Sequence, residues 1–257
     1  MTESQSLPEA PRYGVRDVLH QGYLFLKGIY NFVLRPTSRQ TFMALSEAVV
    51  RFRANRDAVR FMLDDPRVAE LCRERYIGNS YDPNVLIHYP AGSLGHELAA
   101  AMLRRGFDPE FYRDYYGDGA PRFENDEQYL RFRVRQTHDI VHIITGFDMD
   151  EFPGELGMQA FHAAQTRRPF SVALVGFGLI RIVLKPGELP QTLQQVAKGF
   201  AMGYAVRSLV GERFEENWAK PVAEWRRELG LVAEDAFDLA GAVRRGTSRS
   251  EAHDARS

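Results

Sequence analysis

The sequence predicts an all-α protein: a single helical domain of about eight helices, with a metal site between two consecutive helices and an apolar slot. Apolar residues recur near the helical period of 3.6. Residues 170–184 are the one stretch whose pattern does not separate a helix from a strand. Cap and stop residues separate the helical stretches. A chain of 257 residues can bury one sizeable core. We expect a disordered N-terminus (1–12), one helical domain (13–232) and a mobile C-terminal tail (233–257).

The first half of the chain predicts four helices. The first covers about residues 17–34, which are densely apolar and are followed by Arg35-Pro36. The second begins at Thr37 or Ser38 and runs to about Leu63, because its apolar residues share one helix face. The remaining two are a helix capped by Asp65 that begins at Pro66, and one from Ser93 to Arg105 that Gly106 ends.

The second half predicts four or five more helices. Loops are expected at 77–92 and 107–125. The expected helices are one capped by Asn125 or Asp126 and ended by Gly146, one from about Pro153 to Arg168, one from about Gln191 to Val210, and one over 212–229 that Pro221 kinks or breaks. The apolar stretch 170–184 is either a fifth helix or a strand.

Composition excludes several classes of protein. Hydrophobic residues make up 44% and charged residues 26%, which is typical of globular chains, and the net charge of −1 gives no reason to expect a nucleic-acid partner. The single cysteine, Cys72, excludes an internal disulfide and a cysteine-rich zinc site. The longest apolar run, Phe170–Ile180, is shorter than the roughly 20 residues of a membrane span. The N-terminal residues resemble neither a signal nor a transit peptide.

One stretch combines residues that bind divalent metals. His138 and His142 are four residues apart, so a helix places them about 40° apart on one face, with Asp139 beside them. Glu155 stands at the start of the next helix, which a short turn folds back toward this face. Two imidazoles and two carboxylates suit zinc above all, with iron or manganese as alternatives.

The same residues have plainer interpretations. A pair of histidines four apart on a helix is often not a ligand pair, and Asp139 can instead orient an imidazole by a hydrogen bond. The motif is not the H-E-x-x-H of zinc proteases, whose glutamate is a general base. Gln159 and His162 share the helix face of Glu155, so both are candidates to support the site.

Residues 122–155 resemble the ubiquinone (coenzyme Q) biosynthesis protein 4 family, whose hallmark is H-D-x-x-H followed by Gly-Glu after a short turn. Further landmarks in the same order extend the resemblance over about residues 17–232: Asp65-Pro66, Pro90 to Gly95, Arg122-Phe123, Ala164 to Thr166, and Glu212-Arg213 before Trp218.

The chain departs from the family pattern at one place. Twelve residues lie between His142 and Glu155, one more than is usual in the family. The additional residue falls in the acidic turn around Asp148–Phe152. If the turn does not absorb it, Asp150 or Glu151 takes the place of Glu155 as a ligand.

The resemblance implies an all-α fold and a metal held by His138, Asp139, His142 and Glu155. It implies a metal-dependent decarboxylase/hydroxylase that replaces the ring carboxylate of a polyprenylated benzenoid lipid with a hydroxyl. It also implies peripheral attachment to the inner membrane surface beside other ubiquinone biosynthesis enzymes. Because no transit peptide is recognised, we expect a bacterial protein on the cytoplasmic side of that membrane. A homodimer is compatible with the sequence.

Two other functions remain open. The first is a non-catalytic, lipid-binding scaffold that organises the ubiquinone enzymes. The second is an HD-type metal phosphohydrolase, in which His88 or His96 serves as an upstream ligand, but this leaves Gly154-Glu155 unexplained. Two segments have open roles as well. The stretch 170–184 is either a slot for the isoprenoid tail or a buried core helix, and Arg131, Arg133 and Arg135 either meet anionic groups or form a solvated helix face.

Overall fold

The computed structural model describes Tyr23 and residues 53–107 and 121–231, and all of these except Tyr23 belong to one unit, residues 52–257. Several expected segments lie outside the described residues: the disordered N-terminus, the helix over 17–34 apart from Tyr23, the start of the second helix, most of the loop 107–125, and the C-terminal tail. The domain boundaries at residues 13 and 232 therefore stay predictions.

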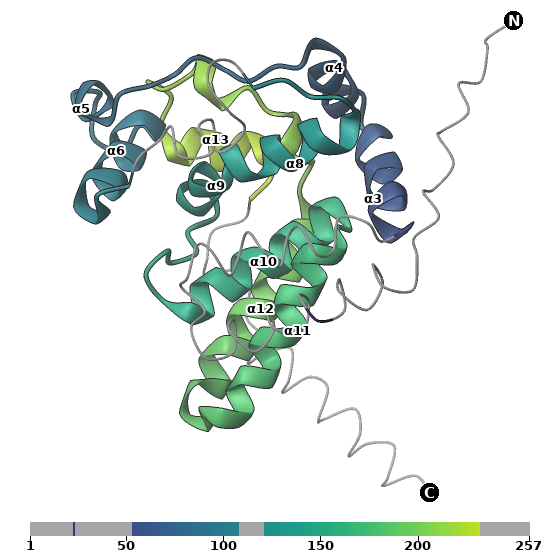
Figure 1. The fold of residues 1–257 in the computed structure, drawn as a ribbon. Helices are drawn as coiled ribbons and strands as arrows, with labels where there is room; N and C mark the ends of the chain where they lie inside the picture. Colours follow the sequence, from purple (N-terminus) through teal and green to yellow (C-terminus); the bar gives the residue numbers. More distant parts are fainter. Residues whose placement is uncertain (1–22, 24–52, 108–120, 232–257) are drawn as a thin grey trace, which may run out of the picture. The chain divides into compact units, whose positions relative to one another are not determined.

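The described residues are helical, and no β-strand occurs among them (Figure 1). They contain ten α-helices where the sequence predicts about eight. These are α3 (Arg53–Leu63), α4 (Pro66–Glu74), α5 (Pro83–Leu86), α6 (Leu94–Arg105), α8 (Asp126–Gln136), α9 (His138–Thr145), α10 (Phe152–Thr166), α11 (Pro169–Leu184), α12 (Leu189–Ala205) and α13 (Val222–Leu229). Three 3₁₀ turns, η1 (Pro186–Glu188), η2 (Leu209–Gly211) and η3 (Phe214–Glu216), connect the later helices.

Several predicted helix ends are confirmed. The Asp65 carboxylate accepts a hydrogen bond of 2.9 Å from the Arg67 backbone N–H, and Pro66 is the first residue of α4. The Ser93 hydroxyl accepts from the His96 backbone N–H at the start of α6. Gly106 ends α6 with φ of 63°, in the left-handed region that glycine adopts without strain.

The helix expected to carry the histidine pair is two helices. α8 ends at Gln136 and α9 begins at His138, with Thr137 between them. The Thr137 hydroxyl donates to the Arg133 backbone carbonyl at 2.9 Å, a side-chain bond that competes with helix geometry and bends helices. Because of this break, α9 presents its histidines on an axis of its own.

Three further elements differ in part from the predictions. The expected loop 77–92 contains α5, which the Asp82 carboxylate caps through the Asn84 backbone N–H at 2.8 Å. The predicted break at Pro221 is confirmed, since Pro221 caps α13, but the residues before it form η3 in place of the expected helix from Glu212. The helix expected to reach Val210 ends at Ala205.

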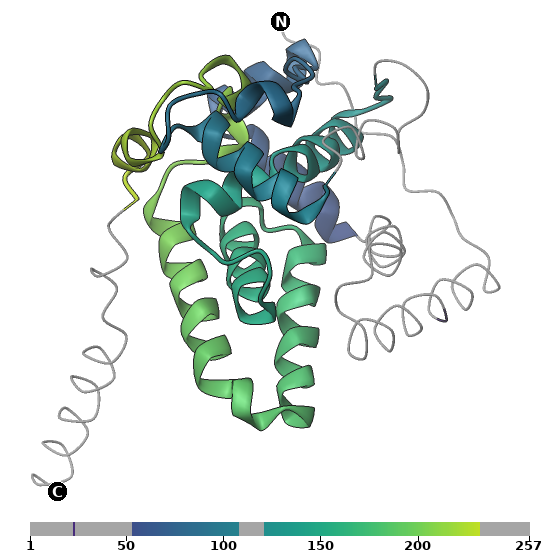
Figure 2. The same ribbon diagram turned by 90° about the vertical axis from the view of Figure 1, so that its left-hand side faces the viewer.

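Helices α10, α11 and α12 lie side by side in both ribbon views, with α10 packed closely along α12 (Figures 1 and 2). Glycines permit this approach. A Cβ atom at Gly203 would stand 2.8 Å from the Phe161 carbonyl oxygen, and one at Gly199 would clash with the Gly157 carbonyl oxygen. The backbones of α10 and α12 are therefore in close contact. This contact fixes the position of α10, the helix that carries Glu155.

α9 lies among α6, α8, α10 and α13 (Figure 1). Its apolar side chains join a core with residues of all these helices except α8. The core members include Leu98, Ile140, Ile144, Phe161 and Trp225, each at most 4% exposed. The short helix that carries both histidines is thus held by packing on its apolar side.

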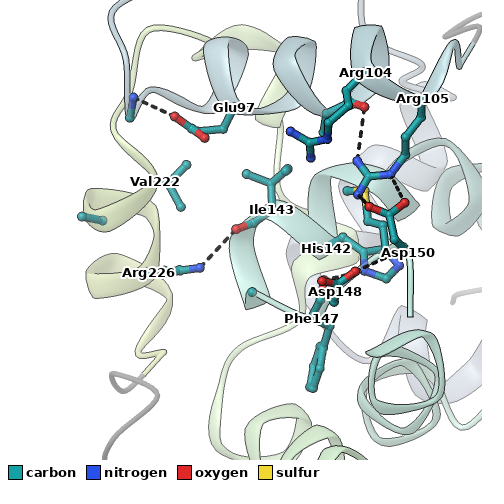
Figure 3. Close-up of a pocket in the computed structure, with 15 residues that line it drawn as sticks. Glu97, Arg104, Arg105, His142, Ile143, Phe147, Asp148, Asp150, Val222 and Arg226 are labelled. Carbon is teal, nitrogen blue, oxygen red and sulfur yellow. Dashed lines mark hydrogen bonds and ion pairs between the residues drawn. The ribbon is translucent and has the colours of Figure 1, made fainter. Parts of the chain in front are cut away.

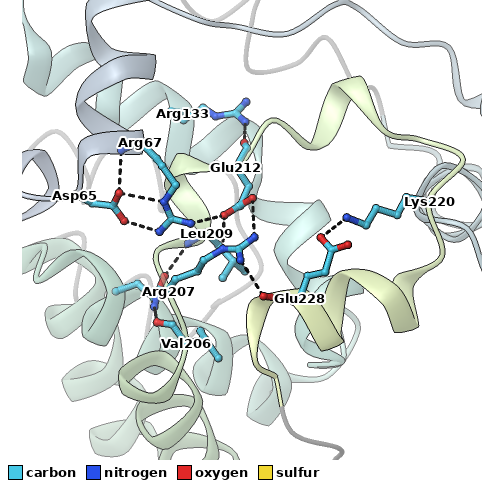
Figure 4. Close-up of polar contacts among 10 residues, drawn as sticks. Asp65, Arg67, Arg133, Val206, Arg207, Leu209, Glu212, Lys220 and Glu228 are labelled. Atoms are coloured by element: carbon cyan, nitrogen blue, oxygen red, sulfur yellow. Dashed lines mark hydrogen bonds and ion pairs between the residues drawn. The ribbon is translucent and has the colours of Figure 1, made fainter.

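A polar network connects the start of α4 to the segment before α13 (Figure 4). Arg67 binds both oxygens of Asp65 and one oxygen of Glu212, the latter at 2.8 Å. Arg207 binds Glu212 as well, and it donates to the Glu228 backbone carbonyl in α13. These contacts hold the chain between α12 and α13, whose only regular elements are the short 3₁₀ turns η2 and η3.

The three arginines of α8 are not a solvated face. Arg131, Arg133 and Arg135 are all at most 8% exposed. Arg133 forms an ion pair with Glu215 in η3, and both side chains are inaccessible to solvent. The interpretation of these arginines as a solvated face is therefore wrong, and Arg133 has a structural partner in place of a lipid headgroup.

The stretch 170–184 is a helix with two different sides. Phe170, Leu174 and Ile182 are buried, whereas Val172, Ile180, Val183 and Leu184 are 55–80% exposed. It is therefore not a buried core helix. Among the described residues, no helix is both long enough and apolar enough to cross a membrane.

Candidate metal centre

Helix α9 places His138 and His142 one turn apart, with ring centres separated by 4.8 Å. The His142 side chain is inaccessible to solvent, and its Nδ1 lies 2.9 Å from the Phe147 carbonyl oxygen. When Nδ1–H donates to this carbonyl, the lone pair of Nε2 is left for a ligand. Gly146 ends α9 in the left-handed region, with φ of 78°, so the chain turns back and brings Phe147 under the ring.

Glu155 reaches both histidines from the first turn of α10. Its two carboxylate oxygens lie 3.4 Å from Nε2 of His142 and 3.8 Å from Nε2 of His138. Gly154 makes this placement possible, because a Cβ atom there would overlap the backbone of Asp148 in the acidic turn. The Gly-Glu pair therefore works as a unit: the glycine admits the turn and the glutamate faces the histidines.

His138, His142 and Glu155 form a group whose ligand atoms all lie within 4.8 Å of one another. The structure places Asp139 differently, since its carboxylate lies 3.1 Å from Nδ1 of His138. In this position Asp139 orients the ring and leaves Nε2 of His138 directed at Glu155, which corresponds to the plainer interpretation of this residue.

The charges of the group stabilise one another. Burial disfavours the protonated form of His138, but the hydrogen bond with Asp139 and the charge of Glu155 outweigh burial and raise the pKa of His138. Burial also opposes ionisation of Asp139 and Glu155. For each of them the neighbouring histidines outweigh this effect, and the pKa lies below its ordinary value. Both carboxylates are therefore ionised near neutral pH.

The residues fit a divalent metal ion. Nε2 of His142 is buried and faces the Glu155 carboxylate at 3.4 Å without a well-aligned hydrogen bond, a geometry that an ion between the two groups would complete. Three donors of the nitrogen and oxygen types that zinc, iron and manganese take converge on this point. An ion held by two histidines and one glutamate keeps open positions for a further molecule.

The acidic turn absorbs the additional residue without displacing Glu155. Arg105 of α6 binds both oxygens of Asp150 at 2.6 Å, and Gln191 donates to Glu151 at 2.9 Å. The Asp148 carboxylate accepts from two backbone N–H groups of the turn. Asp150 and Glu151 are thus engaged elsewhere, and neither belongs to the group around the histidines.

A pocket of about 500 Å³ opens beside the group (Figure 3). α6, the end of α9, the acidic turn and α13 form its walls, and His142 lines it. Arg226 of α13 donates to the carbonyls of Ile143 and Ile144, so it closes the end of α9. Arg104 and Arg105 also line the pocket, so its wall combines apolar and charged side chains with His142.

His162 is the most unusual neighbour of the group. Its side chain is 3% exposed, and its ring centre lies 6.3 Å from that of His138. Burial, together with the charges of His138, His142 and Arg168, holds the pKa of His162 well below its ordinary value. Neither ring nitrogen has a hydrogen-bond partner.

The sequence did not predict a role for Arg105 in the site, and two other histidines that it offered as ligands lie outside the group. Arg105 was expected only as a helix end, and no local signal connects it to Asp150, 45 residues away. Nδ1 of His96 lies 2.9 Å from the Ile87 carbonyl oxygen, and neither His96 nor His88 belongs to the group. The described residues therefore give the HD-type phosphohydrolase interpretation no upstream ligand.

The fold and the group define a class of protein: a helical chain with two histidines and a glutamate converging between consecutive helices. Residues 16–235 match the family model described as coenzyme Q (ubiquinone) biosynthesis protein Coq4, and the chain belongs to this family. The resemblance seen in the sequence is thereby confirmed.

Relatives and a solved structure agree with this assignment. The chain is 28% identical to a mitochondrial ubiquinone biosynthesis protein coq4 of Aspergillus terreus, over 89% of this chain and 78% of that protein. It is 28% identical to the mitochondrial COQ4 homologue of Rattus norvegicus, over 66% of this chain and 63% of that protein. A crystal structure of a putative ubiquinone biosynthesis protein from Nostoc punctiforme matches with a TM-score of 0.70 and 27% identity, over 82% of this chain and 99% of that one.

Proposed function

We propose that this chain is a metal-dependent enzyme of ubiquinone biosynthesis that replaces the ring carboxylate of a polyprenylated benzenoid lipid with a hydroxyl. The observation that supports this most strongly is the group of His138, His142 and Glu155, with an orphaned buried nitrogen on His142, beside a pocket. Zinc is the first candidate for the ion, and iron or manganese are alternatives. Asp139 either joins as a fourth ligand or keeps orienting His138.

The reaction needs an oxidant. The bond between the ring and its carboxylate breaks, carbon dioxide leaves, a water oxygen bonds to the ring carbon, and two electrons with two protons pass to dioxygen, which leaves as hydrogen peroxide. A bound metal ion supplies Lewis acidity toward the carboxylate and phenol oxygens. The chain itself orients the histidines through Asp139 and Phe147, and it encloses His142 from solvent, which strengthens electrostatic contacts there.

A polyprenylated substrate lies in the membrane, so the proposed enzyme needs a surface that contacts lipid. The tip of the α11–α12 hairpin exposes aliphatic side chains that would gain from burial in lipid: Ile180, Val183, Leu184, Leu189 and Leu193, each 41–80% exposed. This hairpin tip supports the part of the proposal that the chain attaches peripherally to a membrane. The isoprenoid tail would then lie against the exposed face of α11.

Liposome flotation tests the attachment. The double variant Val183→Asp with Leu184→Asp should lose most of its binding to phospholipid vesicles, because each buried aliphatic side chain contributes about 1.5–3 kcal/mol of transfer free energy. Val85→Asp is the matched control, since Val85 is 59% exposed but lies on α5. Equal flotation of all three proteins would contradict a membrane role for the hairpin tip.

The same exposed face favours a second function, a scaffold without catalysis. An apolar surface of this kind also binds proteins, so it can hold other ubiquinone biosynthesis enzymes together. The two functions differ in what His142→Ala does. Lost ubiquinone with the enzymes still associated supports catalysis, and lost association with an intact fold supports the scaffold.

Deletion of the gene in its host tests the proposed reaction. We expect a polyprenylated precursor that retains its carboxylate to accumulate, and the wild-type chain to restore ubiquinone. His142→Ala should not restore it, whereas His96→Ala should, because His96 lies outside the group. Normal ubiquinone levels in the deletion strain, or an accumulated precursor that has already lost its carboxylate, would contradict the proposal.

A further inference from the structure

His162 occupies a position that protein packing alone does not explain. It lies on α10 two turns after Glu155, a spacing that puts both side chains on one helix face. Its ring is inclined by only 28° to that of His138, with ring centres 6.3 Å apart. The imidazole is therefore a direct neighbour of one of the candidate ligands, on the side of α10 that faces α9.

Both nitrogens of His162 lack a hydrogen-bond partner, although the residue is 97% buried, being 3% exposed. A neutral imidazole offers one N–H donor and one lone pair, and leaving either without a partner costs about 1–3 kcal/mol. His96 shows the ordinary solution, since its Nδ1 is partnered by the Ile87 carbonyl oxygen. The two free nitrogens of His162 therefore call for a molecule that the chain itself does not supply.

His162 does not support His138 in the way that Asp139 does. Nδ1 of His138 is already engaged by Asp139, and Nε2 of His138 faces Glu155. Nor does His162 belong to the group whose ligand atoms lie within 4.8 Å of one another. Its ring is thus neither a ligand in this arrangement nor a hydrogen-bonded support for one.

We propose that His162 contacts the bound molecule: its ring forms a hydrogen bond with an oxygen atom of a small, oxygen-bearing ligand held at the His138–His142–Glu155 group. The inference deepens the proposed function, and it rests on that function only in requiring that the metal group take up such a ligand. His162 is then a residue that positions the ligand while the other three hold the ion.

Cobalt-loaded protein provides the test, because the visible absorption of the ion reports its ligands. Two probes are titrated separately: acetohydroxamate, which binds open positions of a metal ion through two oxygens, and 4-hydroxybenzoate, a phenol carboxylate without a lipid tail. In His162→Phe we expect the dissociation constant of acetohydroxamate to rise about fivefold to tenfold, the equivalent of one lost hydrogen bond. Cobalt affinity and the cobalt spectrum should stay unchanged without the probe.

Two variants keep the outcome independent of folding. His162→Gln retains one donor and one acceptor, so it should recover part of the probe affinity. His96→Phe makes the same replacement outside the group, and it should lower the melting temperature through its lost bond to Ile87 while leaving probe affinity unchanged. His162→Phe should melt at the wild-type temperature or above, because it removes two orphaned nitrogens.

The remaining outcomes each decide the question. Cobalt affinity that falls more than about tenfold in His162→Phe would make His162 a metal ligand or a support for one, and would overturn the inference. If His162→Phe binds the probe as tightly as the wild type, the ring only fills space in the core, and the inference is overturned. If the wild-type protein binds neither probe, His162 has no ligand to contact, and the inference is overturned as well. His162-dependent binding of acetohydroxamate without any binding of 4-hydroxybenzoate would sustain the inference and count against the proposed substrate.

Discussion

Two buried polar clusters of this protein differ in how completely they are partnered. In the closed cluster, Arg133 pairs with Glu215, donates to the Glu212 carbonyl and Gln136, and lies 5.3 Å from the centre of the Tyr76 ring, while its Nε is the one guanidinium nitrogen without a hydrogen-bond partner. In the open cluster, Nε2 of His142 and both nitrogens of His162 have no hydrogen-bond partner. A structural network satisfies nearly all of its members, whereas a binding site leaves donors and acceptors for its ligand.

The largest effect is expected from breaking the closed cluster. Arg133→Ala would leave the Glu215 carboxylate buried and unpaired, so we expect a loss of about 3–5 kcal/mol in the free energy of unfolding, measured with urea. The double variant Arg133→Met with Glu215→Leu should regain most of this, since it buries no charge. Arg60→Ala, which removes an exposed ion pair with Asp57, serves as control and should not change stability measurably.

If Arg133→Ala lowers the free energy of unfolding by less than about 1 kcal/mol, water has entered the closed cluster to solvate Glu215. The contrast between the two clusters would then fail.

A smaller effect is expected at the edge of the open cluster. Gly154→Ala introduces a Cβ atom that overlaps the Asp148 backbone, so the turn or the start of α10 must shift at a cost of about 1–3 kcal/mol. Because Glu155 follows directly, zinc affinity should fall as well. In Gly176→Ala, which meets no atom within 4 Å, stability should instead rise by up to about 1 kcal/mol from helix propensity.

Calorimetry of both variants, with and without zinc, measures their melting temperatures and their zinc affinities. Wild-type zinc affinity in Gly154→Ala would mean that the glycine serves the fold alone.

The smallest effect concerns a surface network that resembles neither cluster. Burial opposes ionisation of Asp65, but hydrogen bonds and charge from Arg67 outweigh it and lower the pKa of Asp65. The stability it contributes is therefore fully present above its unfolded pKa of 3.8 and is lost as the pH falls through the lower folded value. Asp65→Asn keeps a good cap without the charge, and should be less stable by under about 1 kcal/mol at neutral pH.

Urea unfolding of both proteins near neutral pH and at about pH 2 checks the sign: the difference should shrink on acidification. A difference that is constant with pH would assign the effect of Asp65 to capping geometry alone.

The sequence predicts the parts of this structure that local chemistry decides. Asp65, Ser93 and Gly146 end or begin helices where expected, because a cap acts within one turn of the residues it satisfies. The histidine pair and Glu155 were predictable for the same reason, since helix spacing and a short turn bring them together. The length of the acidic turn mattered little, because Arg105 and Gln191 hold its two carboxylates away from the histidines.

Other features depend on contacts between residues far apart in the sequence, which no local pattern predicts. Glu215 lies 82 residues from Arg133, so the alternation of arginines in α8 was open to a solvated interpretation until the partner was seen. The break falls at Thr137, whose hydroxyl donates to the Arg133 carbonyl, but Thr145 and Thr166 make the same kind of bond, so the residue type alone does not predict where the helix breaks. The placement of Asp139 on His138 was one of two interpretations, and sequence spacing cannot separate them because both need the same residues.

The central claim is that the open cluster binds one divalent ion through His138, His142 and Glu155. Zinc titration into chelator-treated protein, followed by calorimetry, tests it most directly. We predict one zinc ion per wild-type chain, a higher melting temperature with zinc, and an affinity at least about 100-fold weaker in His142→Ala but unchanged in His96→Ala. Zinc binding that survives His142→Ala undiminished, or a wild-type chain that binds no zinc, iron or manganese, would contradict the account.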